Sequence, residues 1–299
     1  MKSVSVILPV YNGEDTISSV IESIINQSYS YLELLIVNDG SEDNTQMICE
    51  KYAQKDNRIH ILNKNSGGVS SARNLGLENS RGDLICFADA DDKIERVWIE
   101  TMVGAMNNCK HDMVICGYEK NNNVSNESYK FGEQKIYDRD MALDVCLGNL
   151  GGFLWNKIFK REILERYKIK FNTSICECED LLFVCEYLMH CKTVASVADI
   201  LYKYDVSEGN KRSEEKRKSR LIAIACLIEL LKRNKCSSKN IRELVAEFIV
   251  RGNTYNIVFS RKQMNFRFIE GVKDLLVSQH YTVKEKIYHI YFFGKNYKN

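Results

Sequence analysis

The stretch VSVILPVYNGED, residues 4–15, decides the fold. Its first seven residues are mostly apolar and β-branched, which is typical of a strand buried on both faces in a parallel sheet. Apolar residues then recur at helical spacing on one face: Ile17, Val20, Ile21, Ile24 and Ile25. This spacing predicts an amphipathic helix. A buried strand followed directly by such a helix predicts a βα unit.

The same order repeats along the next hundred residues. Further strands are expected at 32–39, 58–63, 83–89 and 112–118, and helices at 41–55, 69–80 and 97–108. This alternation predicts an α/β fold with a mostly parallel sheet and helices on both faces. Ligands of such sheets bind outside the carboxyl ends of the strands. Asp39 and Asp89, which both follow strands, are therefore expected to converge on one crevice.

The rest of the chain is less regular and then helical. Residues 119–150 are polar, with a loop or hairpin expected at 120–128. Helical patterns follow at 219–234, 240–259 and 266–279. These patterns predict a domain over 1–210 and a smaller α-helical region over 211–299, with a soft boundary at 207–216.

The two regions differ in charge. Residues 1–210 carry 22 Lys and Arg against 32 Asp and Glu, a net charge of −10, whereas residues 211–299 carry +12. The last sixteen residues, KEKIYHIYFFGKNYKN (284–299), mix lysines with aromatic side chains, as segments at membrane interfaces do. Peripheral membrane contact is therefore predicted. The alternative is a helical bundle for packing or for self-association into a homo-oligomer. Nucleic acid is not a predicted partner, because no recognition motif is present.

Composition predicts a cytoplasmic protein, placed at the inner face of the membrane if the basic tail binds there. The chain has no apolar run long enough to span a bilayer, and its first residues turn polar too soon for a secretory signal. Its eleven cysteines are an odd number without zinc-finger spacing. They are expected to be reduced and mostly buried.

Three carboxylates crowd the end of one strand in ICFADADD, residues 85–92. The sequence lacks the Gly-rich dinucleotide fingerprint and the P-loop, the two common phosphate-binding motifs of such sheets. A divalent cation held on carboxylates could neutralise a diphosphate instead, and Mg²⁺ and Mn²⁺ prefer oxygen ligands. Such a cation would also offset the repulsion among Asp89, Asp91 and Asp92. Taken alone, these residues equally fit helix caps or turns.

Six motifs in this order resemble the nucleotide-sugar glycosyltransferases of family 2. They are VSVILPVYNGEDTI, ELLIVNDGSEDNT, NSGGVSSARNLGL and ICFADADD within residues 3–118, then GFLWNKIFKREIL (152–164) and ICECEDLLFVCEYL (175–188). The resemblance implies the Rossmann-like GT-A fold. It also implies a nucleotide-binding half over 1–118 and an acceptor-side half over 119–210.

The resemblance assigns donor-binding roles to nine residues. These are Pro9, Val10, Tyr11 and Glu14 near the nucleotide base, Asp39 on the uracil edge, Gly68 (with Gly67) where the backbone approaches the donor, Arg73 near the base or diphosphate, Asp89 on the ribose or sugar side, and Ala90 beside it as a donor-nucleotide contact. An ionised Asp39 suits this role because it accepts an N–H. Alternatives remain for four positions: a helix N-cap for Asp39, a plain turn at Gly67 and Gly68, and a surface position for Arg73.

The resemblance also assigns metal, catalytic and acceptor roles. Asp91 and Asp89 would hold Mn²⁺ or Mg²⁺, with Asp92 supporting them or capping the next helix. Asp180 is the expected catalytic base and Glu179 the alternate; otherwise the two are first-turn helix charges. Trp155, Asn156 and Lys157 would bind the acceptor, unless Trp155 packs in the core. The chain departs from the family at Asp205, where Arg is frequent, so that Lys203, Lys211 or Arg212 would close over the diphosphate.

Together these assignments imply a metal-dependent, inverting glycosyltransferase. It would move a hexose or N-acetylhexosamine from a UDP-sugar to a glycan or lipid-linked glycan, in cell-surface or capsular polysaccharide synthesis. One rival is a nucleotidyltransferase, which should carry a Gly- and Lys/Arg-rich signature where YNGED stands. The other is a binding module that has lost catalysis, which would be expected to lack Asp180.

Overall fold

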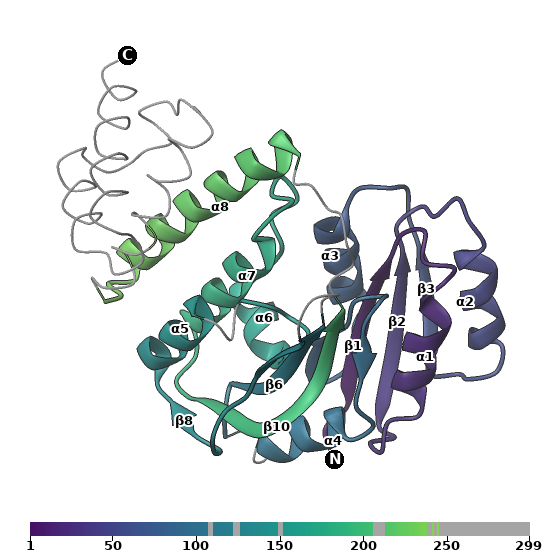
Figure 1. Cartoon of the computed structure of the whole chain (residues 1–299), viewed down its shortest axis with the longest axis horizontal. Helices are drawn as coiled ribbons and strands as arrows, with labels where there is room; N and C mark the ends of the chain where they lie inside the picture. The colour runs from purple at the N-terminus through teal and green to yellow at the C-terminus, as the bar shows by residue number, and fades with distance from the viewer. Residues whose placement is uncertain are drawn as a thin grey trace.

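The computed structural model (Figure 1) is built on one mixed sheet of ten strands with helices on both faces. It describes residues 1–106, 110–121, 126–148, 152–205, 213–237, 241 and 244. The α/β class predicted from the sequence is confirmed.

The first half of the sheet is parallel, as predicted. Its elements are β1 (Val4–Val10), α1 (Ile17–Ile25), β2 (Leu32–Asn38), α2 (Thr45–Ala53), β3 (Ile59–Asn63), α3 (Val69–Asn79) and β4 (Leu84–Phe87). The strand order is β3-β2-β1-β4, with parallel pairing throughout. Parallel pairing brings the carboxyl ends of β2 and β4 to the same edge, on either side of β1.

The second half is mixed rather than parallel. It contains β5 (Lys93–Ile94), α4 (Trp98–Ala105), β6 (Met113–Asn121), β7 (Asn126–Tyr129), β8 (Ile136–Tyr137), α5 (Arg139–Leu147), β9 (Lys157–Lys160), α6 (Arg161–Tyr167), α7 (Glu179–Leu188), β10 (Val194–Asp205) and α8 (Glu214–Arg233). The short strand β9 lies antiparallel between β4 and β6. The expected fifth parallel strand, β6, therefore does not pair with β4. A predicted hairpin does form, because β6 and β7 pair antiparallel.

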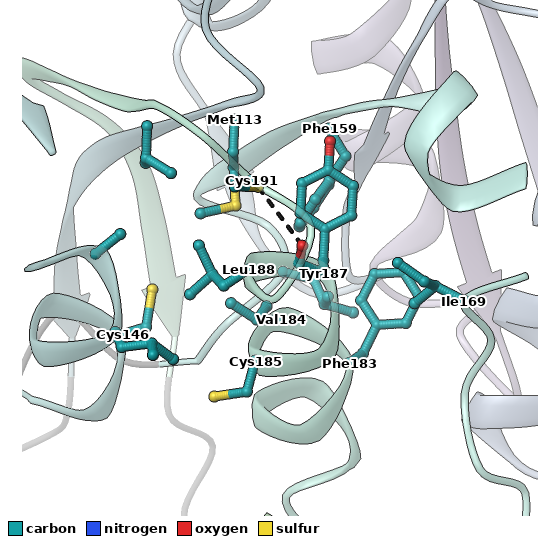
Figure 2. Close-up of a cluster of buried hydrophobic side chains, with 14 of the residues drawn as sticks. Met113, Cys146, Phe159, Ile169, Phe183, Val184, Cys185, Tyr187, Leu188 and Cys191 are labelled. Atoms are coloured by element: carbon teal, nitrogen blue, oxygen red, sulfur yellow. Dashed lines mark hydrogen bonds between the residues drawn. The ribbon is translucent and has the colours of Figure 1, made fainter. Parts of the chain in front are cut away.

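Two hydrophobic clusters fill the two faces of the sheet. Alternate residues of β1 enter them, with Ile7 in one and Val6 and Leu8 in the other, as the period of a strand requires. The cluster containing Ile7 also packs α7. Figure 2 shows Phe183, Val184, Tyr187 and Leu188 of this helix among side chains from several other elements. A helix buried in this way is a rigid support for the residues at its start.

The helix α8 belongs to the same cluster. It buries a full apolar face there: Leu221, Ile224, Leu227, Ile228 and Leu231. The first helix of the predicted C-terminal region therefore shares the core of the α/β domain. Apart from Ile241 and Leu244, the helices predicted at 240–259 and 266–279 and the tail at 284–299 lie outside the described residues. Within the described part of the chain, no helix has the length and apolar character needed to cross a membrane.

Ten of the eleven cysteines lie in the described ranges, and all ten are free thiols. Cys176 is exposed, Cys178 and Cys226 are half-buried, and the others are buried. Most of the described cysteines are therefore buried, as the sequence predicted.

Candidate active site

The side chain of Arg73 joins three carboxylates from two distant segments. Its Nη1 donates to Asp180 Oδ1 at 2.5 Å and to Glu179 Oε1 at 3.2 Å, and its Nη2 donates to Asp89 Oδ1 at 3.0 Å. Only 5% of the Arg73 side chain is exposed, so it is not an ordinary surface residue. The motif acid after β4 and the acidic pair at the start of α7 therefore form one cluster.

Contacts with Phe171 orient Arg73 and the helix α3 that carries it. Its guanidinium lies over the ring of Phe171, 5.6 Å from the centroid. The next residue, Asn74, donates to the Phe171 carbonyl at 2.9 Å and accepts from the Phe171 N–H at 2.8 Å. These contacts fix α3 against the segment that leads into α7.

Asp180 and Glu179 occupy the first turn of α7. The positive end of the helix dipole favours negative charge there. The residue before them, Cys178, has a left-handed backbone with φ of 63°. This conformation costs about 1–2 kcal/mol for a residue other than glycine, so neighbouring contacts must maintain it.

The cluster shifts the pKa values of its members. Burial is the main cause that raises the pKa of Asp180 well above its ordinary value, and Glu179 and Asp89 add to the effect against the opposing charge of Arg73. Burial disfavours the charge of Arg73, but the three carboxylates raise its pKa, so the guanidinium stays charged. A carboxylate with a raised pKa is a better proton acceptor than an ordinary aspartate.

The three acids of the D-A-D-D stretch lie in three different environments. The Asp89 side chain is 29% exposed, and its N–H donates to Tyr202 Oη at 3.2 Å. Asp92 is buried, whereas Asp91 is exposed. Burial, followed by the charges of Asp92 and Asp89, raises the pKa of Tyr202, so this phenol stays protonated. Asp91 is thus the carboxylate most accessible to a ligand from solution.

These residues fit a cation that is shared with a bound phosphate. Among the described residues, no group of three or more His, Cys, Asp or Glu is arranged to hold a metal ion. Mg²⁺, however, is commonly held by one or two carboxylates together with substrate phosphates. The exposed Asp91 and the partly exposed Asp89 supply such oxygen ligands on one turn.

Asp39 organises the loop between β3 and α3. Its carboxylate accepts from the N–H groups of Gly67 at 3.0 Å and Gly68 at 2.8 Å, and from Lys64 Nζ. It does not cap α2, whose N-cap residue is Asn44. Three donors leave one of the roughly four acceptor positions of a carboxylate for a ligand. Sequence reasoning missed Lys64, because no spacing rule links it to Asp39.

The other predicted base-binding residues lie at the end of β1 and in the turn after it. Pro9 and Val10 are buried in β1, and Tyr11 just after it is 54% exposed. Glu14 accepts from the backbone N–H of Asn44 at 3.0 Å and from its side chain at 2.7 Å. This contact ties together the turns after β1 and β2. The donor-binding roles of these residues, and that of the half-buried Ala90, stay predictions.

The three predicted acceptor-binding residues are enclosed by protein. Trp155 is 1% exposed and stacks on Tyr202 with 4.6 Å between ring centroids. Asn156 and Lys157 are fully buried, and Lys157 Nζ donates to Asn156 Oδ1 at 2.8 Å. Burial lowers the pKa of Lys157. Trp155 thus packs in the core, which was the alternative to acceptor binding. An acceptor contact for the three residues stays a prediction.

Two further expectations concern the residues around the diphosphate. Lys203 Nζ pairs with Glu95 Oε1 at 2.8 Å, so it is already engaged. Lys211 and Arg212 lie outside the described residues. Sequence reasoning also missed Tyr202, which lies on β10. The alternating aromatic residues of LYKY (201–204) are the signal that could have indicated a strand there.

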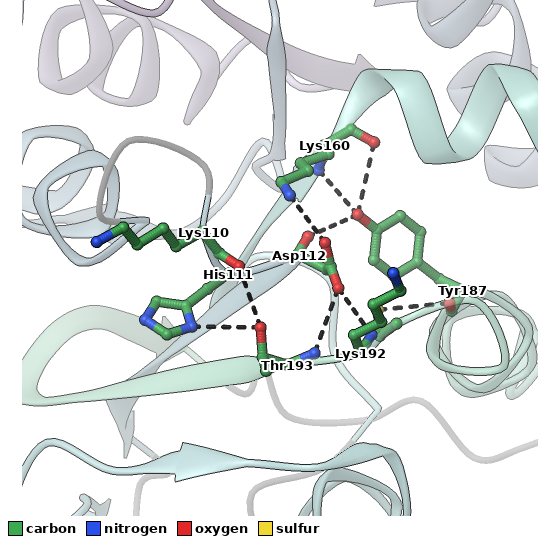
Figure 3. A network of polar contacts seen from close by, with 8 residues as sticks. Lys110, His111, Asp112, Lys160, Tyr187, Lys192 and Thr193 are labelled. Carbon is green, nitrogen blue, oxygen red and sulfur yellow. Dashed lines mark hydrogen bonds and ion pairs between the residues drawn. The ribbon is translucent and has the colours of Figure 1, made fainter.

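A polar network anchors the opposite end of α7 (Figure 3). The Tyr187 hydroxyl donates to the Asp112 carbonyl at 2.7 Å and accepts from the Lys160 N–H at 2.9 Å. The Asp112 carboxylate pairs with Lys160 Nζ at 2.8 Å and accepts from the N–H groups of Lys192 and Thr193. Burial acts to raise the pKa of Asp112, but these partners hold it below its ordinary value. The network fixes α7 to β6, β9 and β10.

The chain is similar in sequence to several known proteins. The chain is 31% identical over 211 residues to the putative glycosyltransferase EpsH of Bacillus subtilis (strain 168), covering 68% of this chain and 61% of EpsH. It is 32% identical over 216 residues to TarP of Staphylococcus aureus (strain N315), named a poly(ribitol-phosphate) beta-N-acetylglucosaminyltransferase, covering 70% and 64%. The matched part thus spans less than two thirds of either relative.

The fold is also found among solved structures. The crystal structure of S. aureus TarS 1-349 in complex with UDP-GlcNAc superposes with a TM-score of 0.72 at 19% identity, covering 99% of this chain and 91% of TarS 1-349. This similarity confirms the predicted GT-A type of fold. The model of "Glycosyl transferase family 2" matches residues 5–168, more than half of the sequence. The chain therefore belongs to glycosyl transferase family 2.

Proposed function

We propose that the chain is an inverting glycosyltransferase that moves a sugar from a UDP-sugar to a cell-surface glycan. The observation that carries this proposal is the Arg73 cluster. One guanidinium holds an acid of the predicted donor side, Asp89, and the predicted catalytic base, Asp180. A site for displacement at a sugar carbon needs these two functions at a fixed separation.

Asp180 would act as the general base. It would take the proton of the acceptor hydroxyl while that oxygen forms a bond to the anomeric carbon. The bond from this carbon to the diphosphate oxygen breaks, and its electron pair leaves with UDP. Attack from the face opposite the diphosphate inverts the configuration, and no covalent sugar–enzyme intermediate forms. The raised pKa of Asp180 suits this role.

Asp91, with Asp89, would hold Mn²⁺ or Mg²⁺ near the diphosphate. A divalent cation stabilises the charge that develops on a departing diphosphate. Arg73 binds Asp89 Oδ1 and so fixes the orientation of this carboxylate. Tyr202 adds a second contact, through the Asp89 N–H.

The donor and acceptor classes are proposed from the similar proteins. UDP-GlcNAc bound to TarS supports a UDP-hexosamine donor. The name of TarP supports a polyol-phosphate or related cell-surface glycan as the acceptor. A lipid-linked acceptor would place the enzyme at the inner face of the membrane, with the basic tail at 284–299 as the contact.

A panel of UDP-sugars tests the proposal. UDP release is measured with and without Mn²⁺ for the wild type and for Asp91→Ala. We expect release from at least one UDP-hexose or UDP-hexosamine, dependent on Mn²⁺ and strongly reduced in Asp91→Ala. If the wild type neither binds UDP in the presence of Mn²⁺ nor releases it from any donor, the proposal is wrong. Mn²⁺-dependent UDP binding without turnover toward any acceptor would favour the binding-module alternative.

A further inference from the structure

The segment that leads into the catalytic helix is held from two sides. Residues 175–178 form neither helix nor strand, and they directly precede Glu179 and Asp180. On one side, Ser70 Oγ of α3 donates to the Ile175 carbonyl at 3.3 Å. This contact lies on the same helix as Arg73, one turn before it.

The other side is held by α8. Ser219 Oγ accepts from the Cys176 N–H at 2.8 Å, and Arg220 Nη1 pairs with Glu177 Oε1 at 3.4 Å. Ser219 is 5% exposed, and the side chains of Arg220 and Glu177 are 20% and 15% exposed. Two successive residues of α8 therefore hold two successive residues of the segment. A partly buried ion pair such as that of Arg220 with Glu177 is screened much less by salt than an exposed one.

Both contacts rest on rigid supports. The residues of α8 that follow, including Leu221 and Ile224, are buried in the same core as α7. The held segment ends at Cys178, whose left-handed backbone sets the direction in which α7 begins. Such a conformation persists only where its surroundings determine it.

We infer that Ser219 and Arg220 are positioning residues for the catalytic base. They hold Cys176 and Glu177, and through the turn at Cys178 they keep Asp180 in place beside Arg73. The first helix after residue 210 thus completes the active site from the acceptor side. This inference rests on the proposed function, since it assigns a base to be positioned.

The residues predicted to bind the donor and the contacts that hold the base lie on different elements. Loss of a contact that holds the base should therefore affect kcat and the donor KM differently. The predicted donor-binding residues lie on β1, just after the carboxyl ends of β1, β2 and β4, and at the start of α3. In contrast, α8 contacts the segment before α7. Loss of the Arg220 contact should therefore lower kcat and leave the KM for the UDP-sugar nearly unchanged. A displacement of about 1 Å in a reacting group can lower a rate about a hundredfold.

Steady-state kinetics of five variants test this inference: Arg220→Met, Arg220→Lys, Glu177→Gln, the double variant and a control. Arg220→Met is expected to lower kcat by about tenfold to a hundredfold, with the donor KM within about twofold of the wild type. Arg220→Lys keeps the charge and should retain more activity. The double variant Arg220→Met with Glu177→Gln should lose no more activity than Arg220→Met or Glu177→Gln alone. The reason is that the two substitutions remove the same ion pair. The matched control is Lys218→Met, since Lys218 is exposed on the same helix and pairs with Glu214.

A second readout does not depend on activity. The rate at which iodoacetamide alkylates Cys178 is followed by mass spectrometry in Arg220→Met, in Ser219→Ala and in Lys218→Met. We expect a severalfold faster reaction in the first two and the wild-type rate in the control. If the wild type transfers no sugar but Cys178 still becomes more reactive, the proposed function fails while the positioning contact stands.

Three outcomes would overturn the inference. The first is a kcat in Arg220→Met equal to that of Lys218→Met. The second is a change in the donor KM as large as the change in kcat, because this would indicate general damage to the fold rather than displacement of the base. The third is an unchanged alkylation rate of Cys178 in both Arg220→Met and Ser219→Ala. Ser219→Ala keeps the test decisive if Arg220→Met fails to fold.

Discussion

Arg73 reduces the repulsion among three carboxylates that lie close together. Its guanidinium is almost fully buried and binds Asp89, Glu179 and Asp180. Removing one partner of a buried ion pair leaves uncompensated charge in the interior. The cluster should therefore be important for stability as well as for catalysis.

Arg73→Met should be strongly destabilising. We expect the free energy of unfolding to fall by about 3 kcal/mol, because three acids lose their shared cation. Urea unfolding followed by circular dichroism measures this change. Arg81→Met is the control, since Arg81 is exposed and its loss should cost less than about 0.5 kcal/mol. Equal small effects of both substitutions would contradict the buried cluster.

Asp180→Asn should change how stability depends on pH. Because the fold raises the pKa of Asp180, the native state binds this proton more tightly than the unfolded chain does. The resulting stabilisation is present below the ordinary pKa and is lost as pH rises through the raised value. The Asn variant should therefore gain stability relative to the wild type as pH rises, by about 1.4 kcal/mol for each unit of raised pKa. Urea unfolding between pH 4.5 and 8 checks this; a constant difference would contradict it.

For single residues, the sequence predicted which side chains belong to the site better than it predicted the contacts between them. The D-A-D-D and ED motifs identified Asp89 and Asp180, and the resemblance identified Arg73. That these three form one cluster depends on the approach of α3 and α7, more than a hundred positions apart in the chain. No local pattern encodes that approach. The burial of Trp155, Asn156 and Lys157 likewise depends on β9, which enters the sheet from a distant part of the sequence.

At the scale of elements, the start of α3 is set by backbone geometry. Gly68 is its N-cap residue, with φ of 83° and ψ of 164°, and its N–H is bound by Asp39. This region is essentially restricted to glycine. A side chain at this position would have free space, since nothing lies within 4 Å of its Cβ position. Any cost of substitution would therefore come from the backbone.

Two glycine substitutions should have opposite effects. Gly68→Ala should lower the free energy of unfolding by about 1–3 kcal/mol, because alanine is strained at this φ and ψ. Gly104→Ala, also in open space but inside α4, should raise it by about 0.5–1 kcal/mol through helix propensity. Chemical denaturation measures both. Similar effects of the two substitutions would contradict the conformation of Gly68.

Local pattern predicted the elements of the first half well. The strands β1, β2 and β3 lie within a residue of the expected bounds. β1 and β2 are mostly apolar runs, and β3 alternates apolar and polar residues. The helix α2 begins at Thr45, later than expected. The residues before it make contacts with the turn after β1, such as that of Asn44 with Glu14. Such contacts between turns leave no periodic signal.

At the scale of the whole molecule, α8 and the α/β domain share one core. The change in charge near residue 210 predicted a boundary, but charge describes surfaces, whereas α8 buries an apolar face against α7. The predicted boundary at 207–216 stays a prediction. The described part of the chain should unfold as one cooperative unit.

Substitutions in α8 test this unity. Leu227 is fully buried, so Leu227→Ala should cost about 2–5 kcal/mol, as in any well-packed core. It should shift the whole unfolding transition, as measured by both fluorescence and circular dichroism. Ile222→Ala on the exposed face of α8 should cost far less. A separate early transition in Leu227→Ala would show that α8 folds independently.

The basic tail at 284–299 is predicted to contact anionic membranes. If residues 284–299 contact a membrane, a variant that lacks them should sediment less with anionic liposomes than the full chain does. The difference should shrink at high salt, because the attraction is partly electrostatic. Unchanged cosedimentation would contradict membrane contact through this tail.

In the proposed mechanism, Asp180 is the base of a sugar transfer arranged around Arg73. The most direct test is sugar transfer by Asp180→Asn under single-turnover conditions, together with its affinity for UDP. We predict a fall in the transfer rate of at least about a hundredfold, since general base catalysis contributes about 10²–10⁴. The affinity for UDP should stay near that of the wild type. Transfer within a few-fold of the wild-type rate would contradict the assignment.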